Sequence, residues 1–195
     1  MGKVIAFLGA AGAGKTTAAT HVVKIGPKLT PRVEMRRHNF AKPIKEMLKG
    51  LAFGAGMDKT EANRITTDPI LKETQIPQLG NFTPRFLLQS IGTEWGRDIV
   101  HEDFWVMLQM NKVNTALQKG YGVVYDDLRF DNEANFVRAF GGAVVGIKGR
   151  TADIETKAHR SETETPEPDF WLDNSKDEEH LFAQVDEVIA KYLQE

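Results

Sequence analysis

The stretch that decides the fold is "KVIAFLGAAGAGKTT", residues 3–17. Its first part, "KVIAFL", is a short apolar run that ends at a glycine, and it predicts a buried β-strand. Its second part, "GAAGAGKT" at 9–16, fits the pattern G-x-x-x-x-G-K-[ST]. Backbone N–H groups of such a loop, together with the start of the helix that follows, surround phosphate oxygens. The stretch therefore predicts a site for ATP or GTP without saying what the phosphate is used for.

The residue types within this loop indicate separate roles. Gly12 and Gly14 allow a tight turn, Lys15 reaches the terminal phosphates, and the Thr16 hydroxyl is a ligand for Mg²⁺. The alternative is an unremarkable glycine-rich turn, which is disfavoured because the loop lies between a predicted strand and a predicted helix at 15–25. The predicted ATP-binding residues are Ala11, Gly12, Ala13, Gly14, Lys15, Thr16 and Thr17.

The composition excludes several classes of protein. The 195 residues suffice for one ordinary domain, 1–195. Cysteine is absent, which excludes a disulfide framework and a thiolate metal site. The net charge of −2 argues against a protein whose whole surface binds nucleic acid. No apolar run approaches the roughly 20 residues of a membrane span, and the N-terminal run is short for a signal peptide. We therefore expect a cytoplasmic protein without a membrane partner.

Apolar runs alternate with helical patterns along the rest of the chain. Further strands are predicted at 32–39, 121–127, 143–149 and 169–174, and further helices at 41–54, 83–98, 103–119, 131–142 and 177–194. Strands separated by helices predict an α/β fold, in which a parallel sheet carries helices on both faces. Ligands of such folds bind at the carboxyl ends of the strands. Two polar stretches, 55–82 and 150–168, are long for plain connections and are predicted to be lids or insertions.

Two aspartates end the predicted strand "GVVYDD", residues 122–127. Loops of this type hold Mg²⁺ with the help of an acid at such a strand end, and both Asp126 and Asp127 are candidates. Arg129 follows just beyond the strand, on the ligand edge of the sheet, where it can reach a phosphate. The alternatives are an ordinary strand-to-turn transition, in which aspartate is common, and a surface arginine.

The choice between GTPase and kinase depends on motifs outside the loop. A guanine-reading N-K-x-D motif has its nearest match in "NKVN" at 111–114, which lacks the aspartate and lies within a predicted helix. We therefore favour a small-molecule kinase, which needs a second anionic site and a basic lid around the transferring phosphoryl group. The lid candidate is the segment 149–169, with Arg150, His159 and Arg160, and its alternative is a solvated loop.

The stretch "TPRFLLQSIGTEWGRDI", residues 83–99, has the spacing of a helix with an unusual polar side. At about 100° per residue, residues four apart lie near one another on an α-helix. The opposite side is predicted to face the core, with Leu87, Leu88, Ile91, Trp95 and Ile99. The polar side carries Arg85, Gln89, Thr93 and Arg97, with Gly92 and Gly96 beside them. We expect these two glycines to leave room for a ligand.

The polar side offers groups that suit a nucleotide. Arg85 has a bidentate fork for phosphate, Gln89 has a donor and an acceptor for a base edge, and Phe86 has a ring that can stack on a base. The alternative is that the arginines pair with acids of the chain. Because Arg97 lies about 120° from Arg85 on an α-helix, we expect Arg97 to anchor the helix rather than bind the same phosphate.

The chain resembles the phage-type deoxynucleoside monophosphate kinases, within the P-loop nucleoside monophosphate kinase group. The matching stretches are "FLGAAGAGKTT", "FAKPIKEML", "TPRFLLQSIGTEWGRD", "DFWV", "YDDLRFDNEANFVRAFGG" and "HRSETE", in this order between residues 7 and 164. The resemblance implies transfer of the ATP γ-phosphate to a deoxynucleoside monophosphate, with Mg²⁺. It also implies a P-loop NTPase fold with a five-stranded parallel core, a monophosphate-binding region at 40–110 and a lid. A homodimer follows only by analogy.

The resemblance also implies roles for single residues. The catalytic residues would be Lys15, Arg129, Arg150 and Arg160, and the metal side would be Thr16 with Asp127, while Asp126 stays the other candidate acid. The monophosphate site would consist of Phe40, Lys45, Arg85, Gln89, Thr93, Trp95, Arg97 and Asp98, joined by Phe86 and Arg129.

Two other functions stay open on the sequence. One is a kinase for another small phosphorylated acceptor of the phosphomevalonate type, which shares a D-x-R strand end. The other is a binding or switch module that uses ATP to change shape. An aromatic stacking platform favours a base-containing acceptor, whereas basic residues alone favour a non-aromatic one. The sequence does not predict which bases are accepted, because base choice depends on a few hydrogen bonds in the pocket.

Overall fold

The apolar run near the N-terminus forms the central strand of a parallel sheet. In the computed structural model, which describes residues 4–29, 32–149 and 166–193, β1 spans Val4–Leu8. The other strands are β2 (Met35–His38), β3 (Gly122–Tyr125), β4 (Ala143–Gly149) and β5 (Phe170–Asn174). The strand order is β2-β3-β1-β4-β5, and every neighbouring pair is parallel. The predicted α/β fold with five parallel strands is confirmed.

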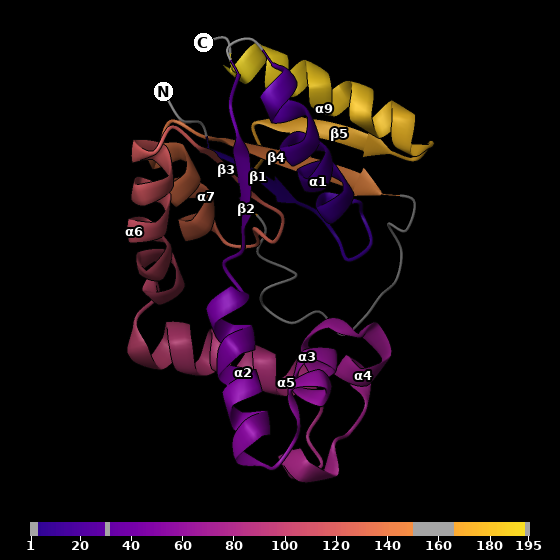
Figure 1. Ribbon diagram of the computed structural model, residues 1–195, viewed down its shortest axis with the longest axis vertical. Coiled ribbons are helices and arrows are strands. Elements are labelled where there is room, and N and C mark those ends of the chain that lie inside the picture. Colours follow the sequence, from indigo (N-terminus) through magenta and orange to yellow (C-terminus); the bar gives the residue numbers. More distant parts are fainter. Residues whose placement is uncertain (1–3, 30–31, 150–165, 194–195) are drawn as a thin grey trace. The chain divides into compact units, whose positions relative to one another are not determined.

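Helices cover both faces of this sheet (Figure 1). The helices α1 (Lys15–Ile25) and α9 (Glu178–Leu193) pack on one face, and α6 (Phe104–Gln118) and α7 (Asp131–Ala139) pack on the other. Because side chains alternate along a strand, β1 contributes Ile5 and Phe7 to one core and its remaining residues to the other. A strand buried on both faces is a continuous apolar run, which made β1 recognisable in the sequence.

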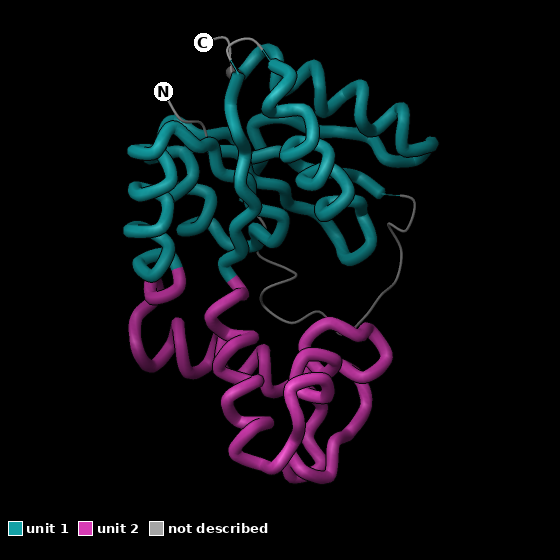
Figure 2. Tube along the Cα trace, viewed as in Figure 1, with its two compact units in different colours: residues 1–40, 106–195 teal, residues 41–105 magenta. Residues whose placement is uncertain are grey.

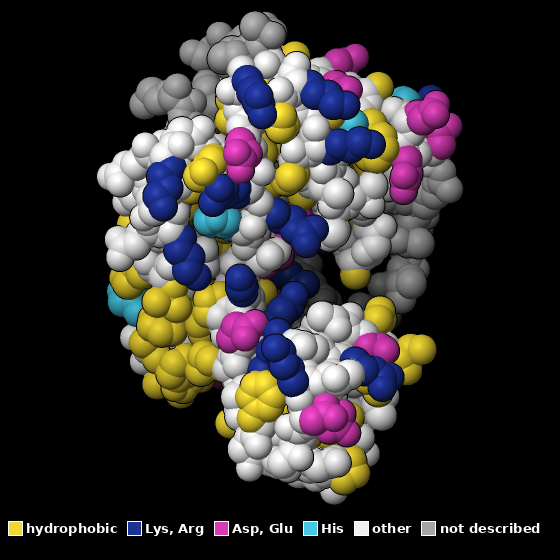
Figure 3. All heavy atoms as spheres, in the orientation of Figure 1, with side chains coloured by type: hydrophobic (Ala, Val, Ile, Leu, Met, Phe, Trp, Pro, Cys, Tyr) yellow, Lys and Arg dark blue, Asp and Glu magenta, His cyan; other side chains and the backbone are white. Residues whose placement is uncertain are grey.

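The chain divides into two compact units (Figure 2). Unit 1, residues 1–40 and 106–195, contains the sheet, and unit 2 is residues 41–105. The elements of unit 2 include α2 (Lys42–Gly54), α3 (Lys59–Thr67), α4 (Pro69–Glu73), α5 (Pro84–Ser90) and η3 (Ile91–Val100). On the face that Figure 3 shows, each unit carries charged side chains of both signs. None of the helices in the described ranges is long and apolar enough to span a membrane.

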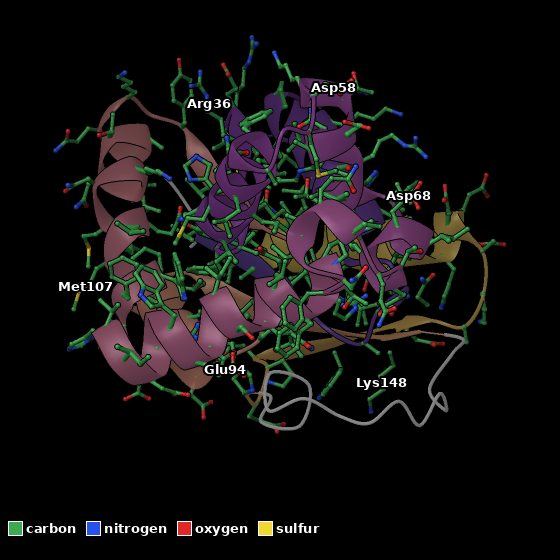
Figure 4. The ribbon with its side chains drawn as sticks, turned by 90° about the horizontal axis from the view of Figure 1, so that it is seen from below. Arg36, Asp58, Asp68, Glu94, Met107 and Lys148 are labelled. Atoms are coloured by element: carbon green, nitrogen blue, oxygen red, sulfur yellow. The ribbon has the colours of Figure 1, made fainter. Side chains whose placement is uncertain are left out.

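The polar stretch 55–82, predicted to be a lid or an insertion, forms short helices. Asp58 begins α3 with a capping box: its carboxylate accepts the Glu61 N–H at 2.9 Å, and the Glu61 carboxylate accepts the Asp58 N–H at 2.9 Å. Asp68 begins α4 in a similar way by accepting two backbone N–H groups. Both aspartates are labelled in Figure 4. A small core supports these helices, formed by Leu48, Ala52, Met57, Ala62 and Ile65.

The segment predicted as one α-helix at 83–98 is two helices of different type. It begins as the α-helix α5 and continues as the π-helix η3. In a π-helix each N–H bonds five residues back, as the His101 N–H does to the Gly96 carbonyl at 3.1 Å. The wider turn changes which residues share a side. Leu87, Leu88 and Ile91 pack against a core of unit 2 as predicted. Trp95 and Ile99, also predicted to face the core, are 39% and 75% exposed.

The two glycines of η3 make room for protein side chains. A Cβ at Gly96 would lie 2.6 Å from the indole nitrogen of Trp105, and a Cβ at Gly92 would lie 3.2 Å from Cδ1 of Ile44. The Trp105 indole also donates a hydrogen bond to the Gly92 carbonyl at 2.7 Å. The expectation that these glycines leave room for a ligand is wrong, because Trp105 and Ile44 already fill the space.

Gly96→Ala is expected to lower the free energy of unfolding by about 1–3 kcal/mol, since the added methyl group overpacks a fully occupied contact. The measurement is urea denaturation of the variant beside the original chain. Gly50→Ala is the matched control, because Gly50 lies in α2 with nothing within 4 Å of an added Cβ. The control is expected to gain about 0.5–1 kcal/mol. Equal changes in both variants would contradict the packing role of Gly96.

Candidate nucleotide-binding site

The loop between β1 and α1 has the backbone of a phosphate-binding loop. Gly12 and Gly14 have φ angles of 78° and 101°, a region that favours glycine. Gly14 is the residue before α1, and the first turn of α1 carries no acidic side chain. The positive end of the helix dipole therefore meets no negative side chain there, which suits an anion. The loop is fastened by Asn174 at the end of β5, whose amide donates to the Ala13 carbonyl at 3.0 Å.

Lys15 spans its own loop. Its ammonium group donates to the carbonyls of Gly9 at 2.6 Å and Ala10 at 2.7 Å. Burial and, to a smaller extent, the positive charge of Arg129 lower the pKa of Lys15 to about 8, while Asp126 and Asp127 act in the opposite direction. A bound phosphate would add negative charge and favour the protonated lysine.

Asp126 lies beside Thr16. The Thr16 hydroxyl donates to the Asp126 carboxylate at 2.8 Å, and the Asn39 amide donates to the other carboxylate oxygen. The Arg37 guanidinium lies 3.9 Å away. The carboxylate is 8% exposed and is held by groups from β2 and α1. Of the two candidate acids, this one contacts the threonine of the loop.

Asp127 has a different neighbour. Its carboxylate accepts the Phe40 N–H at 3.1 Å. The Phe40 ring, predicted for the monophosphate site, is 2% exposed and stacks on Tyr125 with 4.2 Å between ring centroids. The ring is therefore part of the core of unit 1, and the backbone of Phe40 contacts the acid. The sequence analysis did not predict a role for Asn39. The signal that could have indicated one is its position at the end of the predicted strand 32–39, where ligands bind.

The oxygen groups beside the loop fit Mg²⁺. This ion prefers hard oxygen ligands and is usually held by one or two carboxylates together with substrate phosphates. The Thr16 hydroxyl and the adjacent Asp126 carboxylate provide such oxygens, with Asp127 as the next acid along the chain. Within the ranges that the structure describes, no group of three or more His, Cys, Asp or Glu side chains is arranged to hold a metal.

Unit 2 carries most of the residues predicted for the monophosphate. Arg85 forms an ion pair through Nε with Glu73 of α4. Phe86 is 50% exposed and stacks on the equally exposed Phe82, with 5.3 Å between centroids. Arg97 donates to the Glu102 carbonyl at 3.2 Å, just beyond the end of η3.

The remaining predicted residues of unit 2 differ in exposure. Thr93 is buried at 7% exposure, whereas Lys45 and Gln89 are half-buried and Asp98 is exposed. Trp95 contacts Phe104 edge to face, with 5.6 Å between centroids. The predicted lid residues Arg150, His159 and Arg160 lie outside the described residues, so the roles of these three stay predictions.

Comparison with known proteins supports the resemblance drawn from the motifs. No model of a protein family matches the chain. A protein of Acanthamoeba polyphaga mimivirus, whose name assigns it provisionally as a deoxynucleotide monophosphate kinase, is 29% identical over 199 aligned positions and covers 93% of both chains. The deoxynucleoside-5'-monophosphate kinase of Escherichia phage T5 is 24% identical and covers 71% of this chain and 72% of its own. This chain is similar in sequence to viral proteins that are named as deoxynucleotide or deoxynucleoside monophosphate kinases. The predicted resemblance is confirmed.

Two solved structures are similar over the whole chain at low identity. One is the Mycobacterium tuberculosis APS kinase CysC in its Cys556Ala mutant form, with a TM-score of 0.45, 16% identity and coverage of 100% of this chain and 98% of that one. The other is an unliganded sugar kinase from Janibacter sp. HTCC2649, with a TM-score of 0.48, 13% identity and coverage of 100% and 95%.

Proposed function

We propose that this chain transfers the γ-phosphoryl group of ATP to a deoxynucleoside monophosphate, giving the diphosphate and ADP. The observation that carries the proposal is the Thr16–Asp126 contact at a phosphate loop, in a chain related over 93% of its length to a protein named for this activity. This contact joins the loop to the end of β3, as a kinase site for a metal-bound triphosphate requires. If the chain is encoded by a phage, it acts in the cytoplasm of the infected cell.

The proposed chemistry is mainly positioning and charge neutralisation. Lys15 and Arg129 neutralise charge on the transferring phosphoryl group, helped by Arg150 and Arg160 of the lid. Thr16 and Asp126 hold Mg²⁺, which supplies further positive charge to the phosphates when it is bound. The reaction needs no covalent intermediate and no general base, because an oxygen of the monophosphate is already a nucleophile.

The proposed acceptor residues of unit 2 are centred on α5 and η3. Arg85 binds the phosphate of the monophosphate, since a guanidinium can bond two of its oxygens at once. Phe86, together with Phe82, presents an exposed aromatic surface on which a base can stack. Arg97 anchors η3. The other proposed residues are Lys45, Gln89, Thr93, Trp95 and Asp98, with Phe40 contributing through its backbone.

The test is a substrate screen with the purified chain, ATP and Mg²⁺. Each deoxynucleoside and ribonucleoside monophosphate is added in turn, together with phosphomevalonate, and both ADP and the phosphorylated product are measured. Acceptor-dependent ADP with one or more deoxynucleoside monophosphates is the expected result. Turnover with phosphomevalonate alone would identify a different kinase. Slow ATP hydrolysis that no acceptor stimulates would identify a switch module, and either outcome rejects the proposal.

A further inference from the structure

We propose that Glu133 is a positioning residue that holds Arg129 in place for phosphoryl transfer, an inference that rests on the proposed function. Glu133 lies in the first turn of α7, and its side chain is buried at 3% exposure. One carboxylate oxygen accepts two backbone N–H groups, from Arg129 at 2.8 Å and from Phe130 at 3.3 Å. The acid thus contacts the backbone of the residue whose side chain is proposed to meet the phosphoryl group.

A buried carboxylate is costly unless it is hydrogen-bonded. The two N–H groups and the positive end of α7 supply the compensation that Glu133 needs, because charge-assisted bonds and the helix dipole both favour an anion there. These bonds restrain the turn between β3 and α7 at the residue that carries the arginine side chain. The side chain of Arg129, an exposed residue, is therefore attached to a restrained position of the backbone.

Capping of α7 alone does not account for this arrangement. In a capping box, the glutamate reaches the N–H of the residue before the helix, which is Phe130 here. The bond from Glu133 to Phe130 is present but is the longer of the two, and the shorter bond goes one residue further back, to Arg129. Phe130 has no side-chain oxygen for the reciprocal bond. The Glu133 carboxylate therefore bonds the Arg129 N–H more closely than it bonds the N–H of Phe130, the residue that caps α7.

A double-mutant cycle tests this role. The four forms are the original chain, Arg129→Ala, Glu133→Ala and the double variant, each assayed for kcat and for both KM values with the best monophosphate. Arg129→Ala is expected to lower kcat by about 10²–10³-fold, as loss of a transition-state donor does. Glu133→Ala is expected to lower kcat about tenfold or more with little change in KM. In the Arg129→Ala background, Glu133→Ala is expected to have no further effect on kcat, because residues that act as one unit are not additive.

Two controls separate positioning from loss of stability. Glu133→Gln keeps a carbonyl oxygen at the same reach and is expected to restore most of kcat. Glu61→Ala removes the equivalent acid of the α3 capping box, which accepts the Asp58 N–H at 2.9 Å in unit 2; it should lower Tm and leave kcat unchanged. If Glu133→Ala does not fold, Glu133→Asp replaces it in the cycle, since its shorter side chain cannot reach both N–H groups.

If Glu133→Ala lowers kcat by the same factor in the original chain and in the Arg129→Ala variant, this role is overturned while the proposed function stays intact. A kcat of Glu133→Gln as low as that of Glu133→Ala would also overturn it, since the acceptor oxygen would then not be what matters. Absence of turnover in the original chain would reject the proposed function first, and this role with it.

Discussion

Lys15→Ala is expected to lower kcat for phosphorylation of a deoxynucleoside monophosphate by about 10²–10³-fold, the usual cost of removing a group that stabilises transition-state charge. Lys15 is the basic side chain within the phosphate loop, and its ammonium group already lies along that loop, bonded to two of its carbonyls. The measurement is steady-state kinetics at saturating ATP and monophosphate. Lys24→Ala is the matched control, because Lys24 is an exposed lysine in the last turn of the same helix and should leave kcat unchanged.

The pH dependence of kcat/KM for ATP gives a second readout of the same residue. This ratio reports groups of the free enzyme, in which burial lowers the pKa of Lys15 to about 8. The charged lysine is the form that binds phosphate, so the ratio is expected to fall as the pH rises through 8. Lys15→Arg should lack this fall, because a guanidinium stays protonated there. Normal turnover by Lys15→Ala would remove the loop from the mechanism.

Arg85→Ala is expected to raise KM for the monophosphate by about 10–100-fold, the effect of losing a charged hydrogen bond worth about 1.5–3 kcal/mol. KM for ATP should stay nearly constant, since ATP is assigned to the loop of unit 1. Arg85 pairs with Glu73 in this structure, but both side chains are substantially exposed, and exposed pairs contribute little. A phosphate dianion can therefore take the place of the carboxylate.

The control for Arg85 is Arg64→Ala, since Arg64 is an exposed arginine of α3 that lies 3.9 Å from Asp68. It should change neither KM value. A collapse of ATP affinity in Arg85→Ala would assign this arginine to the other substrate or to the fold. An unchanged KM for the monophosphate would remove Arg85 from the acceptor site.

The parts of the fold that could be predicted are those in which local pattern and tertiary role agree. The run Val4–Leu8 is buried on both faces of the sheet and so is apolar at every position. The phosphate loop could be predicted because glycines at fixed spacing are required by its positive φ angles. That an acid at the end of β3 lies near Thr16 could be predicted, since the carboxyl ends of parallel strands meet at one edge of the sheet. Which acid it is, Asp126 or Asp127, could be decided only from the structure.

The parts that could not be predicted depend on contacts between distant residues. Helix η3 does not follow α-helical spacing, and its Gly96 packs against Trp105, a contact that no local sequence pattern predicts. The helices at 59–73 are short and polar, so they lack the apolar stripe on which helix prediction relies. Asn39 is an ordinary polar residue in the sequence, and its contact with Asp126 joins residues 87 positions apart.

The bond from Asn174 to the Ala13 carbonyl has a consequence for the order in which the protein matures. It joins residues 161 positions apart, so the loop is fastened by a strand that is synthesised much later. Contacts of such separation form late, because the intervening chain must first be closed into a loop. A nascent chain that has emerged only as far as β4 possesses the whole glycine motif but not its fastening. Tight ATP binding is therefore expected to begin only after β5 has been synthesised.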